Sequence, residues 1–154
     1  MVNDGLKYVS KNETDTINFA QKIASKLTKH DIIILNGDLG SGKTKFTEGL
    51  LSYFNLKDEI SSPTFNIVNE YISDLFTIFH FDVYRLNSAD EFYELGGMEY
   101  FDRGLCIIEW GEYIKELLPK HYIQIDFKRD YKEEENVRII QIKKGGERFE
   151  NLIN

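Results

Sequence analysis

The stretch Gly37-Asp38-Leu39-Gly40-Ser41-Gly42-Lys43-Thr44 decides the fold. It carries the pattern G-x-x-x-x-G-K-[ST], which is typical of a phosphate-binding loop between a strand and a helix. Residues 31–35 form a short apolar run rich in β-branched side chains, which predicts a buried strand before the loop. Residues 43–54 carry apolar side chains at helical spacing, which predicts a helix directly after it.

The residue types of this loop suit a nucleotide with Mg²⁺; ATP or ADP is the nucleotide that we expect once the base is considered below. Glycines let the backbone turn successive N–H groups toward an anion, and the start of the helix adds its positive end. Lys43 is expected to reach the β- and γ-phosphates, and the Thr44 hydroxyl to join the coordination of Mg²⁺. The alternative is a glycine-rich turn without a ligand, but the flanking strand and helix favour nucleotide binding. The residues expected to contact the nucleotide here are Asp38, Leu39, Gly40, Ser41, Gly42, Lys43 and Thr44.

The whole chain has the composition of one soluble globular domain. Its 154 residues, taken as a single domain over 1–154, are 42% hydrophobic and 29% charged. The net charge of −7 argues against a large nucleic-acid surface, so any contact with RNA is expected to be indirect, through a partner. Residues 1–5 contain no signal-peptide core, and no apolar run approaches membrane-spanning length. We therefore expect a cytoplasmic protein without membrane contact.

Acidic residues follow two apolar runs downstream of the loop. Asp82 comes after the run 75–81, and Glu109 comes after the run 105–108. A carboxylate at a strand exit is the Walker-B arrangement, which holds Mg²⁺ directly or through water. The sequence does not decide which acid touches the metal; we favour Glu109 as the ligand and Asp82 as the group that orients water or acts in the outer sphere.

Three other chemically distinctive residues are expected to be structural. Cys106 is the only cysteine, which excludes an intramolecular disulfide and a thiolate metal cage, and its apolar surroundings predict a small buried hydrophobe. No second histidine stands at metal-ligand spacing from His80, so a satisfied structural imidazole is favoured over a base or a ligand. Trp110, taken alone, would be assigned to core packing.

The remaining pattern predicts an α/β fold. It is expected to be a P-loop NTPase three-layer sandwich, with a mostly parallel central sheet and antiparallel strands added. The final two strands alternate polar and apolar residues, so we expect both to be antiparallel additions with one wet face. The elements expected besides those at the loop are helices at 13–27, 89–95 and 112–118, and strands at 6–9, 65–72, 75–81, 105–108, 121–127 and 137–142.

Two polar segments resemble functional elements of nucleotide-binding proteins. The loop 61–65, shaped by Pro63, is either a switch that senses the γ-phosphate or an ordinary connection. Thr28-Lys29-His30-Asp31 matches the guanine-reading pattern T-K-x-D, but it precedes the strand of the phosphate loop, whereas a guanine reader should follow a strand. Adenine is therefore favoured as the base.

Taken together, these motifs resemble the bacterial TsaE (YjeE) family of small P-loop ATPases. Their order and approximate gaps agree with the family over nearly the whole chain. Ser41, where the family usually has alanine, and Val83, where it often has leucine, are minor departures. Beyond the phosphate loop, the resemblance rests on Ser62-Pro63-Thr64-Phe65, His80-Phe81-Asp82-Val83-Tyr84-Arg85, Ile108-Glu109-Trp110, Glu94-Leu95-Gly96, Glu99-Tyr100-Phe101 and Leu118-Pro119.

The resemblance implies an ATPase that acts in forming threonylcarbamoyladenosine in tRNAs that read codons starting with A. In the family, TsaD with TsaB transfers the threonylcarbamoyl group, and TsaE binds that pair and hydrolyses ATP to permit repeated turnover. By carry-over, Lys43 and Thr44 hold phosphates and Mg²⁺, Glu109 is a metal-site acid, and Asp82 is needed for hydrolysis.

The resemblance also implies four further site residues. Thr64 would lie near the γ-phosphate, Trp110 beside the site, and Thr16 and Arg138 along the nucleotide pocket. The sequence shows no evident arginine finger; Arg85 and Arg103 are the candidates, which predicts weak hydrolysis without partners. Two other classes stay open: a small-molecule kinase, although no arginine-rich lid follows, and a binding module that nucleotide merely gates.

Overall fold

A computed structural model describes residues 5–38, 41–56, 68–84, 86–129 and 137–143. Seven strands, three α-helices and two 3₁₀ helices (η2 and η3) are found in those ranges. In chain order they are β1 (Gly5–Ser10), α1 (Glu13–Ala24), β2 (Ile32–Asn36), α2 (Lys43–Tyr53), β3 (Val68–Ile72), β4 (Thr77–Asp82), α3 (Ala89–Glu94), η2 (Gly97–Asp102), β5 (Leu105–Glu109), η3 (Gly111–Leu117), β6 (Ile123–Arg129) and β7 (Arg138–Lys143).

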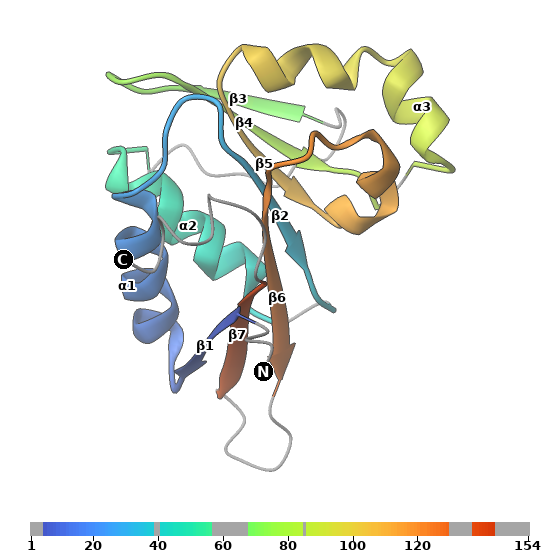
Figure 1. Ribbon diagram of the computed structural model, residues 1–154. Coiled ribbons are helices and arrows are strands. Elements are labelled where there is room, and N and C mark those ends of the chain that lie inside the picture. Colours follow the sequence, from blue (N-terminus) through green and yellow to red (C-terminus); the bar gives the residue numbers. More distant parts are fainter. Residues whose placement is uncertain (1–4, 39–40, 57–67, 85, 130–136, 144–154) are drawn as a thin grey trace.

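The strands form one sheet in the order β1-β7-β6-β2-β5-β4-β3 (Figure 1). Parallel pairs join β6 to β2, β2 to β5 and β5 to β4. Antiparallel pairs add β3 at one edge, and β7 and then β1 at the other. The predicted α/β fold, with a mostly parallel centre and antiparallel strands added, is confirmed.

The prediction that both final strands are antiparallel additions is wrong for β6. This strand pairs in parallel with β2, and only β7 runs against it. Along β6, Ile123, Ile125 and Phe127 are buried, while the residues between them are half-buried or exposed. The alternation therefore reports that one face of β6 is incompletely covered, and it carries no information about strand direction.

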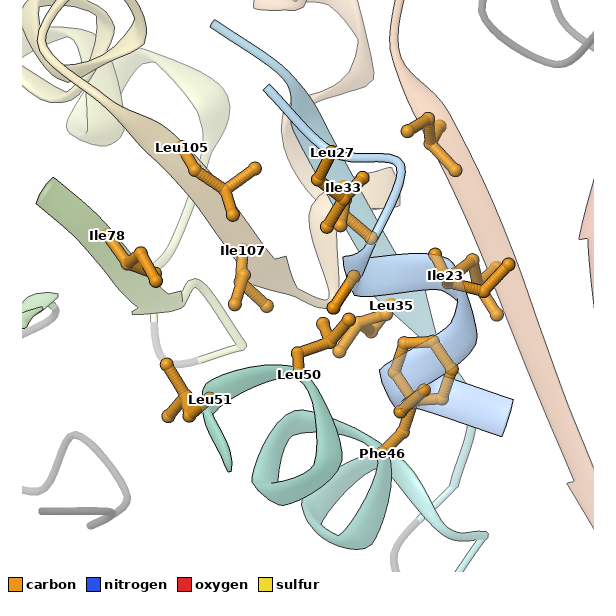
Figure 2. Close-up of a cluster of buried hydrophobic side chains, with 14 of the residues drawn as sticks. Ile23, Leu27, Ile33, Leu35, Phe46, Leu50, Leu51, Ile78, Leu105 and Ile107 are labelled. Carbon is orange, nitrogen blue, oxygen red and sulfur yellow. The ribbon is translucent and has the colours of Figure 1, made fainter. Parts of the chain in front are cut away.

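Helices cover both faces of the sheet, which makes the three layers. On one face α1 and α2 enclose a core with β2, β4, β5 and the strands beyond β2. Figure 2 shows Ile23 of α1 and Leu50 of α2 pointing toward Ile33 and Leu35 of β2. On the other face α3, η2 and η3 enclose a second core with Ile32 and Ile34 of the same strand. Because both of its faces are covered, β2 is buried along its whole length.

The two helices that cover the first face are in close contact at Gly49. A Cβ added there would lie 2.6 Å from the Cβ of Ala20 and 2.7 Å from the carbonyl oxygen of Ile17. The backbones of α1 and α2 therefore meet with no room for a side chain. This contact sets the position of α2, whose first turn follows the phosphate loop.

The second face is covered by one short α-helix and two 3₁₀ helices. Ser88 caps α3 by accepting from the amide of Glu91, as expected of a capping box, and Gly96 ends the segment at φ 78°. The segment predicted as a helix over 112–118 is the 3₁₀ helix η3, broken at Ile114, where φ is −117° and ψ is 22°. The side chain of Ile114 is fully buried, so its burial accompanies the break in the helical backbone.

We expect Gly49→Ala to destabilise the protein, although alanine is the better helix former by about 1 kcal/mol. Overpacking of a filled interface costs up to about 3 kcal/mol, and here the obstacle is backbone. The free energy of unfolding in urea should fall by about 2 kcal/mol. Asn18→Ala, on the exposed side of α1, is the control and should change it little. An unchanged unfolding midpoint for Gly49→Ala would contradict the close contact.

We expect the single thiol to be inert in the folded protein. Cys106 is fully buried, its Sγ lies 3.5 Å from the carbonyl oxygen of Tyr100, and burial raises its pKa to about 12. Near pH 8 the thiolate fraction should be roughly a thousandfold below that of an ordinary thiol. Mass spectrometry after iodoacetamide treatment should show alkylation in urea only. Rapid labelling without urea would contradict the buried placement.

Candidate functional site

The phosphate loop leaves the carboxyl end of β2 under tight steric limits. Gly37 has φ 152° and Gly42 has φ 110°, conformations that side chains with a Cβ rarely adopt. A Cβ on Gly37 would also lie 2.7 Å from the carbonyl oxygen of Phe127 in β6. The loop is therefore held directly against the neighbouring strand, and only glycine fits at its first position.

The helix that follows begins without a side-chain cap. Asn12 caps α1 and Ser88 caps α3, whereas Gly42 precedes α2 and no side chain in the described ranges caps its first amides. The first turn of α2 holds no acidic residue either. Its free amides and positive dipole end are therefore available to an anion.

Lys43 stands at that helix start as a buried cation. Its side chain is about 5% exposed, and Nζ lies 4.0 Å from the centre of the Trp110 ring. Across the described residues, no carboxylate lies within 4.0 Å of this ammonium. Burial lowers the pKa of Lys43, and the negative charges of Glu109, Asp82 and Asp38 oppose that shift. An incoming anion would supply the partner that this cation lacks.

The two strand-end acids lie side by side at the same edge of the sheet. Asp82 ends β4, Glu109 ends β5, and the two are partners in the parallel register. Their side chains therefore leave the same face, the one covered by α2. Oδ1 of Asp82 accepts from the amide of Tyr84 at 3.0 Å, which fixes the turn after β4.

Glu109 has a buried partner, His80, and this contact was not predicted from the sequence. Nε2 of His80 lies 2.6 Å from Oε2 of Glu109, and the two side chains are 3% and 13% exposed. Nδ1 of His80 is buried, and no hydrogen-bond partner for it is found in the described part of the chain. We expected a structural imidazole with both nitrogens satisfied. Among the described residues only Nε2 has a hydrogen-bond partner, and that partner is the candidate site residue Glu109.

Trp110 follows Glu109 in a conformation that a bulky residue rarely takes. Its φ is 63°, and its amide donates to the carbonyl oxygen of Leu35 at 2.8 Å. One side of its ring meets Lys43, and Tyr84 and Tyr113 lie 4.9 and 5.7 Å from its centre. Backbone strain of this kind gathers at functional sites, and here it places an aromatic face beside the loop lysine.

Comparison with known proteins places this chain in a family. A sequence profile described as "Threonylcarbamoyl adenosine biosynthesis protein TsaE" matches residues 10–139. The chain belongs to the TsaE family. It is 42% identical to the tRNA threonylcarbamoyladenosine biosynthesis protein TsaE of Rickettsia typhi, over 92% of this chain and 96% of that protein. It is 36% identical to the TsaE of Bacillus subtilis, over 96% of this chain and 90% of that protein.

The fold agrees with a solved structure. The crystal structure of YdiB from Bacillus subtilis superposes with a TM-score of 0.76 at 33% identity, covering 99% of this chain and 93% of that one. The resemblance found in the sequence motifs is thus confirmed, and the role of this TsaE-family chain is in tRNA threonylcarbamoyladenosine biosynthesis.

The remaining predicted residues of this TsaE-family site are only partly brought together. The Cγ of Arg138 lies 3.7 Å from where a Cβ on Gly42 would be, so this arginine flanks the loop. Thr16 is buried in α1, with its hydroxyl 2.7 Å from that of Ser10. Glu13 in the same first turn lies 3.6 Å from Lys45 of α2, which places the start of α1 beside the loop helix.

Within the loop itself, Ser41 is buried and its amide donates to the carbonyl oxygen of Asp38 at 3.1 Å. Its hydroxyl has no hydrogen-bond partner within the described residues. Asp38 and Thr44 are exposed. The predictions for Leu39, Gly40, Thr64 and Arg85, and for the loop 61–65, lie outside the described residues.

Two contacts of this TsaE-family site were missed by the sequence interpretation, namely His80 with Glu109 and Lys43 with the Trp110 ring. A signal for the first was present, because His80 and Asp82 are two residues apart on a strand and so share a face. The T-K-x-D segment has a structural explanation, since Oδ2 of Asp31 accepts from the amide of Thr28 at 2.7 Å. It closes the turn before β2, at the opposite end of that strand from the phosphate loop.

Proposed function

We propose that this chain binds Mg-ATP at residues 37–44 and hydrolyses it, in support of threonylcarbamoyladenosine formation by a TsaD–TsaB pair. The substrate of the pair would be tRNAs that read codons starting with A. The observation that carries the proposal is the buried ammonium of Lys43, which stands at the uncapped start of α2 without an ion-pair partner among the described residues. A triphosphate would satisfy both the cation and the helix amides.

The residues present fit Mg²⁺ as well as phosphate. Within the described residues there is no cluster of three or more His, Cys, Asp and Glu side chains that could hold a metal by itself. Mg²⁺ suits such a site because it usually keeps several waters and takes one or two carboxylates plus substrate phosphates. Glu109 and the exposed Thr44 would hold it, and bound Mg²⁺ would offset charge on the β- and γ-phosphates.

Hydrolysis would proceed by in-line attack of water on the γ-phosphorus. The bond to the bridging β–γ oxygen breaks as the new P–O bond forms, which yields ADP, inorganic phosphate and a proton. Lys43 and the loop amides would stabilise charge on the phosphates, and Asp82 would orient the water. The sequence shows no evident arginine finger, so the TsaD–TsaB pair is expected to complete the site.

Contact with tRNA would be made by the TsaD–TsaB pair and not by this chain. The net charge of −7 gives this chain little attraction for a phosphate backbone. None of the helices in the described ranges is long and apolar enough to cross a membrane. A cytoplasmic location, where tRNA is modified, fits the proposed role.

Binding of a triphosphate should change the fluorescence of Trp110, the single tryptophan of the chain. Lys43 must leave the indole face to reach phosphate, so the environment of the ring changes. We expect a saturable emission change on titration with ATP, and also with inorganic tripolyphosphate, which has no base to stack on the ring. Lys43→Met should abolish the tripolyphosphate response while its thermal unfolding stays cooperative. ATP binding detected by equilibrium dialysis without any emission change would contradict this assignment of Lys43.

Phosphate release from ATP should be slow for the chain alone and should rise at least about tenfold when the TsaD–TsaB pair is added. Lys43→Ala should abolish both rates, and tRNA modification beyond a first turnover should fail with this variant. The measurement is a steady-state phosphate assay run in parallel with reconstituted tRNA modification. Fast hydrolysis by the chain alone would contradict the partner-dependent proposal.

The same assay separates the other two classes. Phosphate released without any acceptor excludes a small-molecule kinase. Asp82→Asn and Glu109→Gln should stop hydrolysis and repeated tRNA modification together. If repeated modification survives in these variants, nucleotide merely gates binding and hydrolysis is incidental.

A further inference from the structure

Two opposite charges, one buried and one half-buried, lie in this site without meeting. Lys43 is about 5% exposed and the side chain of Glu109 is 13% exposed, and each acts on the other electrostatically. No ion pair joins Lys43 to Glu109, which means that the ammonium nitrogen and the carboxylate oxygens are more than 4.0 Å apart. In surroundings with little water the attraction between unlike charges is strong, so their separation needs a cause.

Each of the two charges is held by a neighbour of its own. The ammonium of Lys43 lies over the face of Trp110 at 4.0 Å, an attractive cation–π contact. The carboxylate of Glu109 meets Nε2 of His80 at 2.6 Å, the distance of a strong charge-assisted hydrogen bond. The tautomer that fits this contact carries its proton on Nε2 and donates it to Oε2 of Glu109.

Apolar side chains lie next to His80 along β4 and across on β5, while its partner on β3 is Asn69. Ile78 precedes it on the same face of β4, and Ile107 is its partner on β5, both fully buried. Nδ1 of the ring has no hydrogen-bond partner within the described residues, so the imidazole is poorly satisfied there. Native proteins seldom leave a buried polar atom in this condition, and such an atom calls for an explanation. The explanation available is the bond from the other nitrogen to Glu109.

We propose that His80 is a positioning residue, which holds the Glu109 carboxylate away from Lys43 so that the lysine stays available to phosphate. This inference rests on the proposed function, because it takes phosphate as the partner of Lys43. His80 occupies Oε2, and no hydrogen-bond donor to Oε1 of Glu109 is found among the described residues, so one oxygen stays available to a cation. Without the imidazole, Glu109 turns to Lys43 and the two neutralise each other.

A matched pair of variants tests the role of Nε2. His80→Gln places an amide nitrogen close to the position of Nε2 and should keep Glu109 in place. His80→Asn is equally polar but reaches only the position of Nδ1, so it should release the carboxylate. We expect ATP binding without Mg²⁺ to weaken about tenfold in His80→Asn, because phosphate must displace Glu109 from Lys43, and to stay near the parent value in His80→Gln. Thermal unfolding of both variants checks that the fold is kept.

A second substitution separates positioning from a general loss of structure. Glu109→Gln removes the charge that captures Lys43, so the double variant His80→Asn/Glu109→Gln should recover the ATP affinity of Glu109→Gln alone. Weakening that persists in the double variant would overturn the proposal, since a merely structural role of His80 is indifferent to the charge at position 109. Equal weakening in His80→Gln and His80→Asn would also overturn it.

Crystal structures of the nucleotide-free parent and of His80→Asn provide a readout that needs no nucleotide. The Glu109 carboxylate should contact His80 in the parent and Lys43 in the variant. If the Glu109 carboxylate keeps its position in His80→Asn, the role proposed for His80 is wrong, even if the protein hydrolyses Mg-ATP. Conversely, a parent protein that binds no ATP would end the proposed function, while the movement of Glu109 would still decide the role of His80.

Discussion

Parallel pairing of β2, β5 and β4 is the constraint on which the site depends. It aligns three strand ends at one edge of the sheet, and from these ends come the phosphate loop, Glu109 and Asp82. Hydrogen bonds across this edge hold the register, since Val83 donates to the carbonyl oxygen of Glu109 and Trp110 donates to that of Leu35. The residues proposed to carry the chemistry are therefore positioned by backbone pairing inside a core that is covered on both faces.

The electrostatics of the site follow from that arrangement. Bringing three strand ends together also brings together one lysine and several carboxylates in a place with little water. Aromatic and imidazole side chains keep the charges apart, with Trp110 over Lys43 and His80 against Glu109. The left-handed backbone at Trp110 is part of this arrangement. It turns the chain directly after Glu109, and the Trp110 ring lies against the ammonium of Lys43.

Sequence patterns predicted most of the elements, but not every direction or boundary. The hydrophobic spacing identified α1, though its regular part ends at Ala24, after which i to i+3 bonds lead to the still-buried Leu27. Alternation in β6 was taken as a sign of antiparallel pairing, whereas it records an incompletely covered face. The periodicity of burial along a strand depends on what covers its two faces. The direction in which it pairs depends on the chain connections, which the residues of the strand itself do not reveal.

By itself the sequence determined the glycine-rich loop between strand and helix, the two acids at strand exits, the α/β class and the family, because these depend on local residue types and spacing. Only the tertiary structure decided which groups meet. The contacts of Lys43 with Trp110 and of His80 with Glu109 join residues 67 and 29 positions apart by chain number. Such contacts arise from strand order and register, which long-range packing sets, so no local pattern could reveal that the charges of the site are held apart.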